Sequence, residues 1–85
     1  MPMFMKKPIA IEARHFAEDN AGEVADWCGG LINKRDDDSI SSIVIYTLEG
    51  PMMGYLGDWI IKGVRGEFYP CREEIFYETY EEVNE

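Results

Sequence analysis

Cationic and aromatic side chains occur close together in the C-terminal half of this acidic chain. A guanidinium group can form paired hydrogen bonds with a phosphate, and an aromatic ring can stack on a base. The pattern therefore indicates a candidate site for a nucleotide ligand. Its candidate residues, one of them from the N-terminal part, are Arg14, Trp59, Lys62, Arg65, Tyr69 and Arg72. In the alternative interpretation the rings belong to the core and the cations neutralise nearby carboxylates, such as Glu67, Glu73 and Glu74.

Catalytic motifs do not accompany these residues. His15 is the single histidine, so a cysteine–histidine pair would need Cys28 or Cys71 beside it. No serine occurs in a Gly-x-Ser-x-Gly arrangement, and no helix directly follows Gly63 and Gly66 to bind a phosphate. Carboxylate pairs are expected by chance among 17 acidic residues, so they indicate no acid–base chemistry. We therefore expect a protein that is not an enzyme and uses no cofactor.

Three consecutive aspartates, Asp36 to Asp38, raise the question of a metal site. Adjacent side chains point in different directions, and no glycine or distal glutamate follows at the spacing of a calcium-binding EF-hand. We expect a solvated loop there and no metal site. Cys28 and Cys71 form no Cys-x-x-Cys pair, so both are expected to stay reduced and to act as small hydrophobic residues.

The composition fits one soluble domain spanning residues 1–85. A hydrophobic content of 46% argues against disorder. No apolar run reaches the roughly 18–20 residues that cross a bilayer, and no secretory signal begins the chain, so we expect a cytoplasmic protein without membrane contact. The formal net charge of −9 repels phosphates and disfavours direct nucleic-acid binding, but it leaves open mimicry of DNA.

Hydrophobic periodicity predicts several short strands. Alternation indicates a first strand over residues 6–16 and a strong one over residues 41–48. Glycines 63 and 66 favour a turn that joins strands at 59–62 and 67–71 into a β-hairpin. Shorter strands are expected at 31–33 and 52–53, and a polar loop at 34–39.

Two short helices are expected as well. The capping-box spacing of Asn20 and Glu23 predicts a helix over residues 21–28, which ends at Gly29. The second helix is expected over residues 73–80, with an acidic tail at 81–85. Its predicted apolar stripe consists of Ile75, Phe76, Thr79 and Tyr80.

These elements predict an α+β fold, in which two short helices cover a twisted antiparallel sheet of four to six strands. In an alternative form of this fold, the sheet curls into a small open barrel. The predicted core consists of Val24, Trp27, Ile43, Ile45, Ile60, Phe68, Ile75 and Phe76. An 85-residue chain rich in aromatic rings and methionines has difficulty burying them in one core. We therefore expect a homo-oligomer, in contact through exposed sheet edges or through a patch around Tyr46, Met52, Met53 and Tyr55.

The hairpin region also carries a resemblance to a known family. The runs Gly57-Asp58-Trp59-Ile60-Ile61-Lys62-Gly63 and Gly66-Glu67-Phe68-Tyr69-Pro70-Cys71 resemble a family of small bacteriophage and prophage proteins. The resemblance includes Lys6-Lys7-Pro8 and Trp27-Cys28-Gly29-Gly30, so it covers most of the chain. The chain departs from the family at Tyr55-Leu56, where Pro tends to precede Gly-Asp, and at Glu73, where Pro is common. The resemblance implies a phage origin and a single accessory domain, and it transfers no catalytic residues.

A phage origin leads us to expect a binding protein that counters a defence inside the host cell. In the first hypothesis it sequesters a nucleotide immune signal, a cyclic oligonucleotide or one of cyclic ADP-ribose type, through the candidate residues above. In the alternative it is an acidic inhibitor or DNA mimic. That inhibitor would bind a host protein through the aspartate loop at 36–38 and the acidic residues between 73 and 85.

Overall fold

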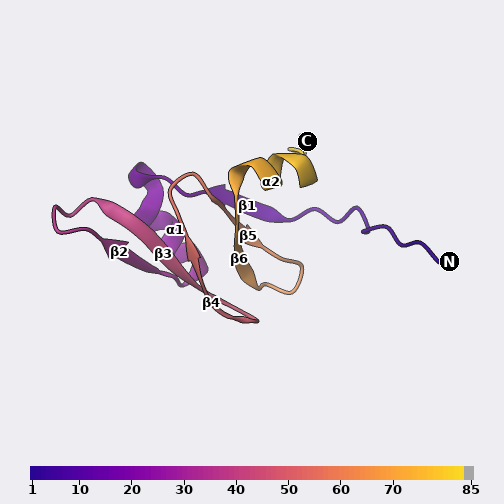
Figure 1. The fold of residues 1–85 in the computed structure, drawn as a ribbon, viewed down its shortest axis with the longest axis horizontal. Helices are drawn as coiled ribbons and strands as arrows, with labels where there is room; N and C mark the ends of the chain where they lie inside the picture. Colours follow the sequence, from indigo (N-terminus) through magenta and orange to yellow (C-terminus); the bar gives the residue numbers. More distant parts are fainter. Residues whose placement is uncertain (84–85) are drawn as a thin grey trace.

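Six short strands and two helices form the structure, a computed structural model that describes residues 1–83 (Figure 1). The predicted α+β class is confirmed. In chain order the elements are β1 (Glu12–His15), the 3-10 turn η1 (Glu18–Asn20), α1 (Ala21–Cys28), β2 (Leu31–Lys34), β3 (Ile40–Thr47), β4 (Gly50–Gly54), β5 (Trp59–Lys62), β6 (Phe68–Cys71) and α2 (Glu73–Thr79). Residues 1–11 form an extended arm (Figure 1). Lys6 in this arm lies 5.6 Å from the centroid of the Tyr80 ring, and the arm then continues away from the rest of the fold toward the N-terminus.

The strands divide into two antiparallel sheets instead of the single sheet expected from the sequence. One sheet has the order β1–β5–β6 and the other the order β2–β3–β4. Over residues 1–83 they do not close into the small barrel that was considered. The strand expected at 52–53 extends over all of β4 and pairs with β3 through a tight turn. The chain then leaves that sheet, and β5 pairs with β1.

The turn between β4 and β5 explains this change of sheet. The Asp58 carboxylate accepts a hydrogen bond from the Tyr55 backbone N–H at 2.9 Å, and Gly57 adopts a φ of 96°. Two backbone hydrogen bonds then tie the turn to Phe16: Gly57 N–H donates to the Phe16 carbonyl at 2.9 Å, and Phe16 N–H donates to the Asp58 carbonyl at 2.8 Å. These bonds hold the start of β5 beside the end of β1.

The first strand is shorter than the 6–16 range expected. β1 can pair only along the four residues of β5, from Glu12 opposite Lys62 to His15 opposite Trp59. At Gly63 the chain turns, so residues before Glu12 have no partner strand in this ladder. The other predicted strands and helices agree with the structure to within one or two residues, apart from the longer β4.

The two faces of the β1–β5–β6 sheet meet different neighbours. Residues paired across an antiparallel ladder share a face, and successive residues alternate. The face with Arg14, Ile60 and Phe68 packs toward α1 and the second sheet. The opposite face, with His15 and Trp59, is covered by α2, which stacks a phenylalanine ring on the tryptophan.

The core lies where α1 meets both sheets. Its buried cluster consists of Phe16, Ala21, Val24, Cys28, Ile43, Ile45 and Ile60. Trp27 and Phe68, expected in the core, are only partly buried and pack against this cluster. The prediction for Ile75 is wrong, because α2 turns Phe76 onto the sheet and leaves Ile75 49% exposed.

The start of α1 also differs from the expected capping box. Asn20 makes no cap to the helix N–H groups. Its side chain instead accepts a hydrogen bond from the Ala17 N–H at 2.8 Å and donates one to the His15 carbonyl at 2.7 Å. Asn20 therefore fixes the short connection between β1 and α1. The predicted end of the helix is confirmed, since Gly29 has the left-handed φ of 68°.

The packing of α2 gives a test of stability. We expect Phe76→Ala to lower the free energy of unfolding by about 3–5 kcal/mol, because it removes a buried ring stacked on Trp59. Ile75→Ala, one position away, should change it by less than about 1 kcal/mol because that side chain is half exposed. Urea unfolding followed by circular dichroism measures both values, and equal losses in the two variants would contradict this docking of α2.

Candidate functional site

The six residues predicted to hold a nucleotide do not meet in one place. Arg14 and Lys62 lie on the face of the β1–β5–β6 sheet that packs toward α1. Trp59 and Tyr69 lie on the opposite face, beneath α2. The sheet backbone therefore separates the two cations from the two rings expected to work with them.

The aromatic rings under α2 are in contact with other rings of the protein. Trp59 lies between His15, at a centroid distance of 4.7 Å and 12° between planes, and Phe76, at 4.4 Å and 7°. The Tyr69 hydroxyl lies 3.5 Å from that of Tyr80, and burial together with this contact raises the pKa of Tyr69. Because both faces of Trp59 are covered, no base can stack on it without displacing His15 or Phe76.

The cations on the opposite face pack on aromatic rings of the protein itself. The Arg14 guanidinium lies 4.5 Å from the centroid of Trp27, and Trp27 Nε1 donates to a Glu12 carboxylate oxygen at 3.0 Å. That carboxylate lies 3.8 Å from Arg14. Lys62 lies 6.0 Å above the Phe68 ring. Arg14 thus lies near a carboxylate, as the alternative interpretation expects of the cations, whereas Lys62 packs on a ring.

The remaining two cations lie on exposed parts of the surface. Arg65 is at the tip of the β5–β6 hairpin, where its backbone N–H donates to Glu67 at 2.9 Å. Arg72 precedes α2 and pairs with Glu74 at 3.2 Å.

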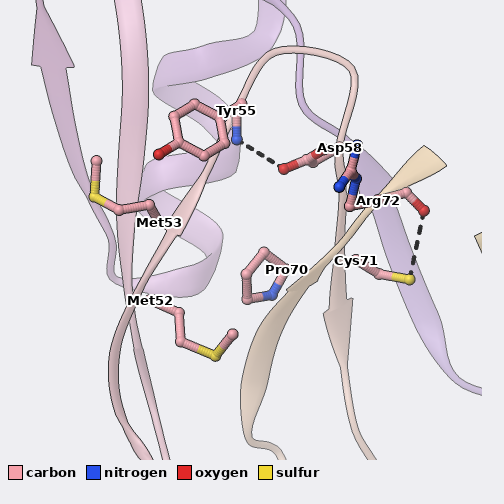
Figure 2. A pocket seen from close by; sticks show the side chains of 7 residues that line it. All are labelled: Met52, Met53, Tyr55, Asp58, Pro70, Cys71 and Arg72. Atoms are coloured by element: carbon pink, nitrogen blue, oxygen red, sulfur yellow. Dashed lines mark hydrogen bonds between the residues drawn. The ribbon is translucent and has the colours of Figure 1, made fainter. Parts of the chain in front are cut away.

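Two adjoining hollows lie between β4 and β6, and they share Met52 and Pro70. We call them together the β4–β6 groove. The first has a volume of about 470 Å³ and is lined by Met52, Met53, Tyr55, Asp58, Pro70, Cys71 and Arg72 (Figure 2). The second, of about 320 Å³, is lined by Thr47, Leu48, Glu49, Met52, Glu67, Phe68, Tyr69 and Pro70.

Pairing in the sheets explains why the groove is apolar. Met52 is opposite Ile45, so its side chain lies on the inner face of the β2–β3–β4 sheet and points toward β6, whereas Met53 points away (Figure 2). Pro70 is opposite Ile60 and lies on the face that the first sheet turns toward the second. Methionine is unbranched and polarisable, so this lining can adapt to different apolar side chains.

Charge at the rim of the groove is mainly negative. Asp58, Glu49 and Glu67 contribute carboxylates, whereas Arg72 contributes the one cation among the lining residues and pairs with Glu74. A phosphate would meet this excess of negative charge, and a lysine or arginine would be attracted by it. The arrangement suits an apolar segment flanked by basic residues.

Sequence reasoning placed only Tyr69 and Arg72 among the residues of this groove as ligand-binding candidates. Met52 and Met53 were assigned to a patch for self-association. The sequence feature that indicates the groove is the Met52-Met53 pair in a short strand. Side chains alternate along a strand, so one of the two methionines must lie on the inner face of the sheet.

The single histidine is not placed beside a cysteine. His15, Trp59 and Cys71 form a row across three strands, so the tryptophan separates the other two. His15 Nε2 lies 2.9 Å from the Gly57 carbonyl oxygen and 3.0 Å from a Glu73 carboxylate oxygen. These contacts tie β1 to the turn before β5 and to the first residue of α2.

The aspartate loop at 36–38 forms a tight turn. Asp37 accepts hydrogen bonds from the Ser39 hydroxyl at 2.6 Å and the Ser39 N–H at 3.0 Å, which lower the pKa of that carboxyl. Of the predicted tail at 81–85, residues 84–85 lie outside the described part of the chain. In residues 1–83, no cluster of three or more histidine, cysteine, aspartate or glutamate side chains could hold a metal ion.

Comparison with family models, curated proteins and solved structures finds no match to the chain. Neither helix of the described chain is long and apolar enough to cross a membrane. The function has to be inferred from the geometry of the chain itself.

The two cysteines give a test of the difference in burial between β6 and α1. Burial raises the pKa of both thiols, and nearby Asp58 and Glu74 add to the effect at Cys71. At about pH 8 both should react with iodoacetamide more slowly than free cysteine, because less thiolate is present. Cys71, which lines the groove, should react well before the buried Cys28.

Mass spectrometry of alkylated Cys71→Ser gives the reaction rate of Cys28, and that of Cys28→Ser gives the rate of Cys71. In urea the two thiols should react alike, which provides the control. Equal reactivity in the folded chain would show that Cys71 is not the more accessible of the two thiols.

Proposed function

We propose that this chain is a non-enzymatic binding protein that holds an extended segment of another protein in the β4–β6 groove. The observation that carries the proposal is the adaptable lining around Met52 and Pro70 under an acidic rim. The segment would present apolar anchor side chains to the groove and lysine or arginine to the rim.

The strands beside the groove favour an extended partner. β4 and β6 are both edge strands of their sheets. An edge strand presents unpaired backbone groups, and an extended peptide can bind such groups while its side chains enter neighbouring pockets. Pro51 and Pro70 each lack an N–H, which limits continuous pairing along the edges. We therefore expect recognition to depend chiefly on side chains in the groove.

The net charge supports a basic partner. With a formal charge of −9, the whole chain attracts a cationic segment at long range and speeds its encounter. The acidic-inhibitor hypothesis drawn from the sequence is retained here, with the groove in place of the aspartate loop as the contact surface. If the resemblance to phage proteins reflects origin, the partner is a protein of the host cell.

The chemistry of the described chain supports binding without turnover. Trp59 lies between His15 and Cys71, and the raised pKa of each thiol lowers the fraction of nucleophilic thiolate. His15 is engaged by Glu73 and the Gly57 carbonyl, contacts that also have a structural use.

Sequestration of a nucleotide immune signal stays a prediction, and the geometry favours it less. A phosphorylated ligand in the groove would have Arg72 as its cation among three carboxylate-bearing residues. Calorimetric titration with a cyclic dinucleotide tests it, and we expect no binding at micromolar concentrations. Tight binding that is lost in Arg72→Ala, with the fold retained, would replace our proposal by the nucleotide hypothesis.

Selection from a displayed library of random peptides tests the groove. We expect selected peptides to combine leucine, isoleucine, methionine or phenylalanine with lysine or arginine, and to bind less tightly as salt screens the rim. Met52→Asn should weaken their binding by about tenfold or more, because it places an amide among apolar anchors.

Val64→Asn is the matched control, since Val64 is 64% exposed at the hairpin tip and lies outside the groove. The Val64→Asn variant should bind the selected peptides as tightly as the unmodified chain does. A library that yields no binder, or binders indifferent to Met52→Asn, would exclude the groove as the peptide site.

A further inference from the structure

Much of the outer face of the β2–β3–β4 sheet is left uncovered by the fold, although Ser42 on this face is buried. The inner face, with Ile43 and Ile45, packs on α1 and on the first sheet. Alternation puts a different set of side chains on the other side of the sheet. We call this set the outer face, and it consists of Leu31, Asn33, Ser42, Val44, Tyr46, Pro51 and Met53.

Apolar side chains dominate this outer face. Leu31, Val44 and Met53 form a row across all three strands, and Tyr46 lies opposite Pro51 in the next row on that face. Leu31 is 58% exposed, Tyr46 56% and Met53 44%. Asn33 and Ser42 supply the polar atoms and satisfy each other, since Asn33 Nδ2 donates to Ser42 Oγ at 3.1 Å.

None of the seven residues of the outer face is charged, although aspartate, glutamate, lysine and arginine make up 29% of the chain. This sets the outer face apart from the β4–β6 groove with its acidic rim. A basic partner would gain nothing from charge on this surface. The absence of charge on this face favours a second copy of the chain. In a symmetric contact, acidic groups of one copy would repel the same acidic groups of the other copy.

The chain exposes more surface than a compact monomer of its mass. A folded monomer of this mass is expected to expose about 5,200 Å², whereas this chain exposes 6661 Å². Its radius of gyration is 14.2 Å, against about 12 Å for a compact domain of this length. The extended arm of residues 1–11 accounts for part of the excess. Met1, Met3, Phe4 and Met5 of this arm are each more than 90% exposed, so the excess describes the arm and not the outer face.

We propose that two copies of this chain associate through their outer faces, sheet against sheet, about a two-fold axis. Val44, in the middle strand of the apolar row, would lie near the axis, and Leu31, Tyr46 and Met53 would pack around it. The interface is distinct from the central anchor of the groove, since Met52 points into the groove on the inner side of the same sheet. Met53 belongs to the outer face and also borders the first hollow.

Analytical ultracentrifugation of the full chain tests the proposal. We expect a mass near twice 9.8 kDa at micromolar concentration and physiological salt. Raising the NaCl concentration from about 50 to 500 mM should tighten association, because salt screens the repulsion between two acidic copies and no ion pair crosses the interface. Tyr46→Glu and Leu31→Glu should each raise the dissociation constant by more than about tenfold.

Val64→Glu provides the matched control, because it adds the same charge at an exposed apolar residue outside the outer face. It should leave the dimer intact, and circular dichroism should show that all variants fold. A monomer throughout the micromolar range would overturn the proposal, as would a dimer that salt dissociates. Loss of the dimer in Phe4→Glu but not in Tyr46→Glu would assign the contact to the N-terminal arm instead and overturn it as well.

Discussion

The burial of Ile60 against Ile43 and Ile45 joins the two halves of this fold. The sheets are separate in their hydrogen bonding, so side chains have to join them. A Cβ atom at Gly54 would lie 3.0 Å from Ile43 Cγ2 and 3.4 Å from Ile60 Cδ1. The tight approach is therefore to Ile43 in the same sheet, and Ile60 packs beside both residues at ordinary van der Waals distance. The β4–β6 groove exists because β6, paired to β5, is brought beside β4 by the same packing.

Local features of the fold could be predicted from the sequence, and the pairing of distant strands could not. The helix that ends at Gly29 and the hairpin from Trp59 to Cys71 depend on neighbouring residues, so periodicity and glycine position suffice to predict them. Pairing of β1 with β5 depends on backbone hydrogen bonds between Phe16 and the Gly57–Asp58 turn. No local pattern specifies that partner, and a single continuous sheet was therefore predicted.

Strand geometry alone separates two of the candidate nucleotide residues. Trp59 and Lys62 are three residues apart on one strand, and alternation already puts them on opposite faces. Their closeness in sequence was the reason for grouping them. The groove is different, since it needs β4 and β6 to lie together across two sheets, and only the folded arrangement shows this.

β4 connects the two proposed surfaces. Met52 and Met53 are adjacent in the chain but point to opposite sides of the sheet, one into the groove and one onto the outer face. A two-fold pair formed through the outer faces would carry two grooves, each built on a strand that also contributes to the interface. Two grooves at a fixed separation can bind two segments of one partner, or two partner copies, with the second contact strengthened by the first. A small chain with shallow grooves could thereby reach an affinity that a single groove does not provide.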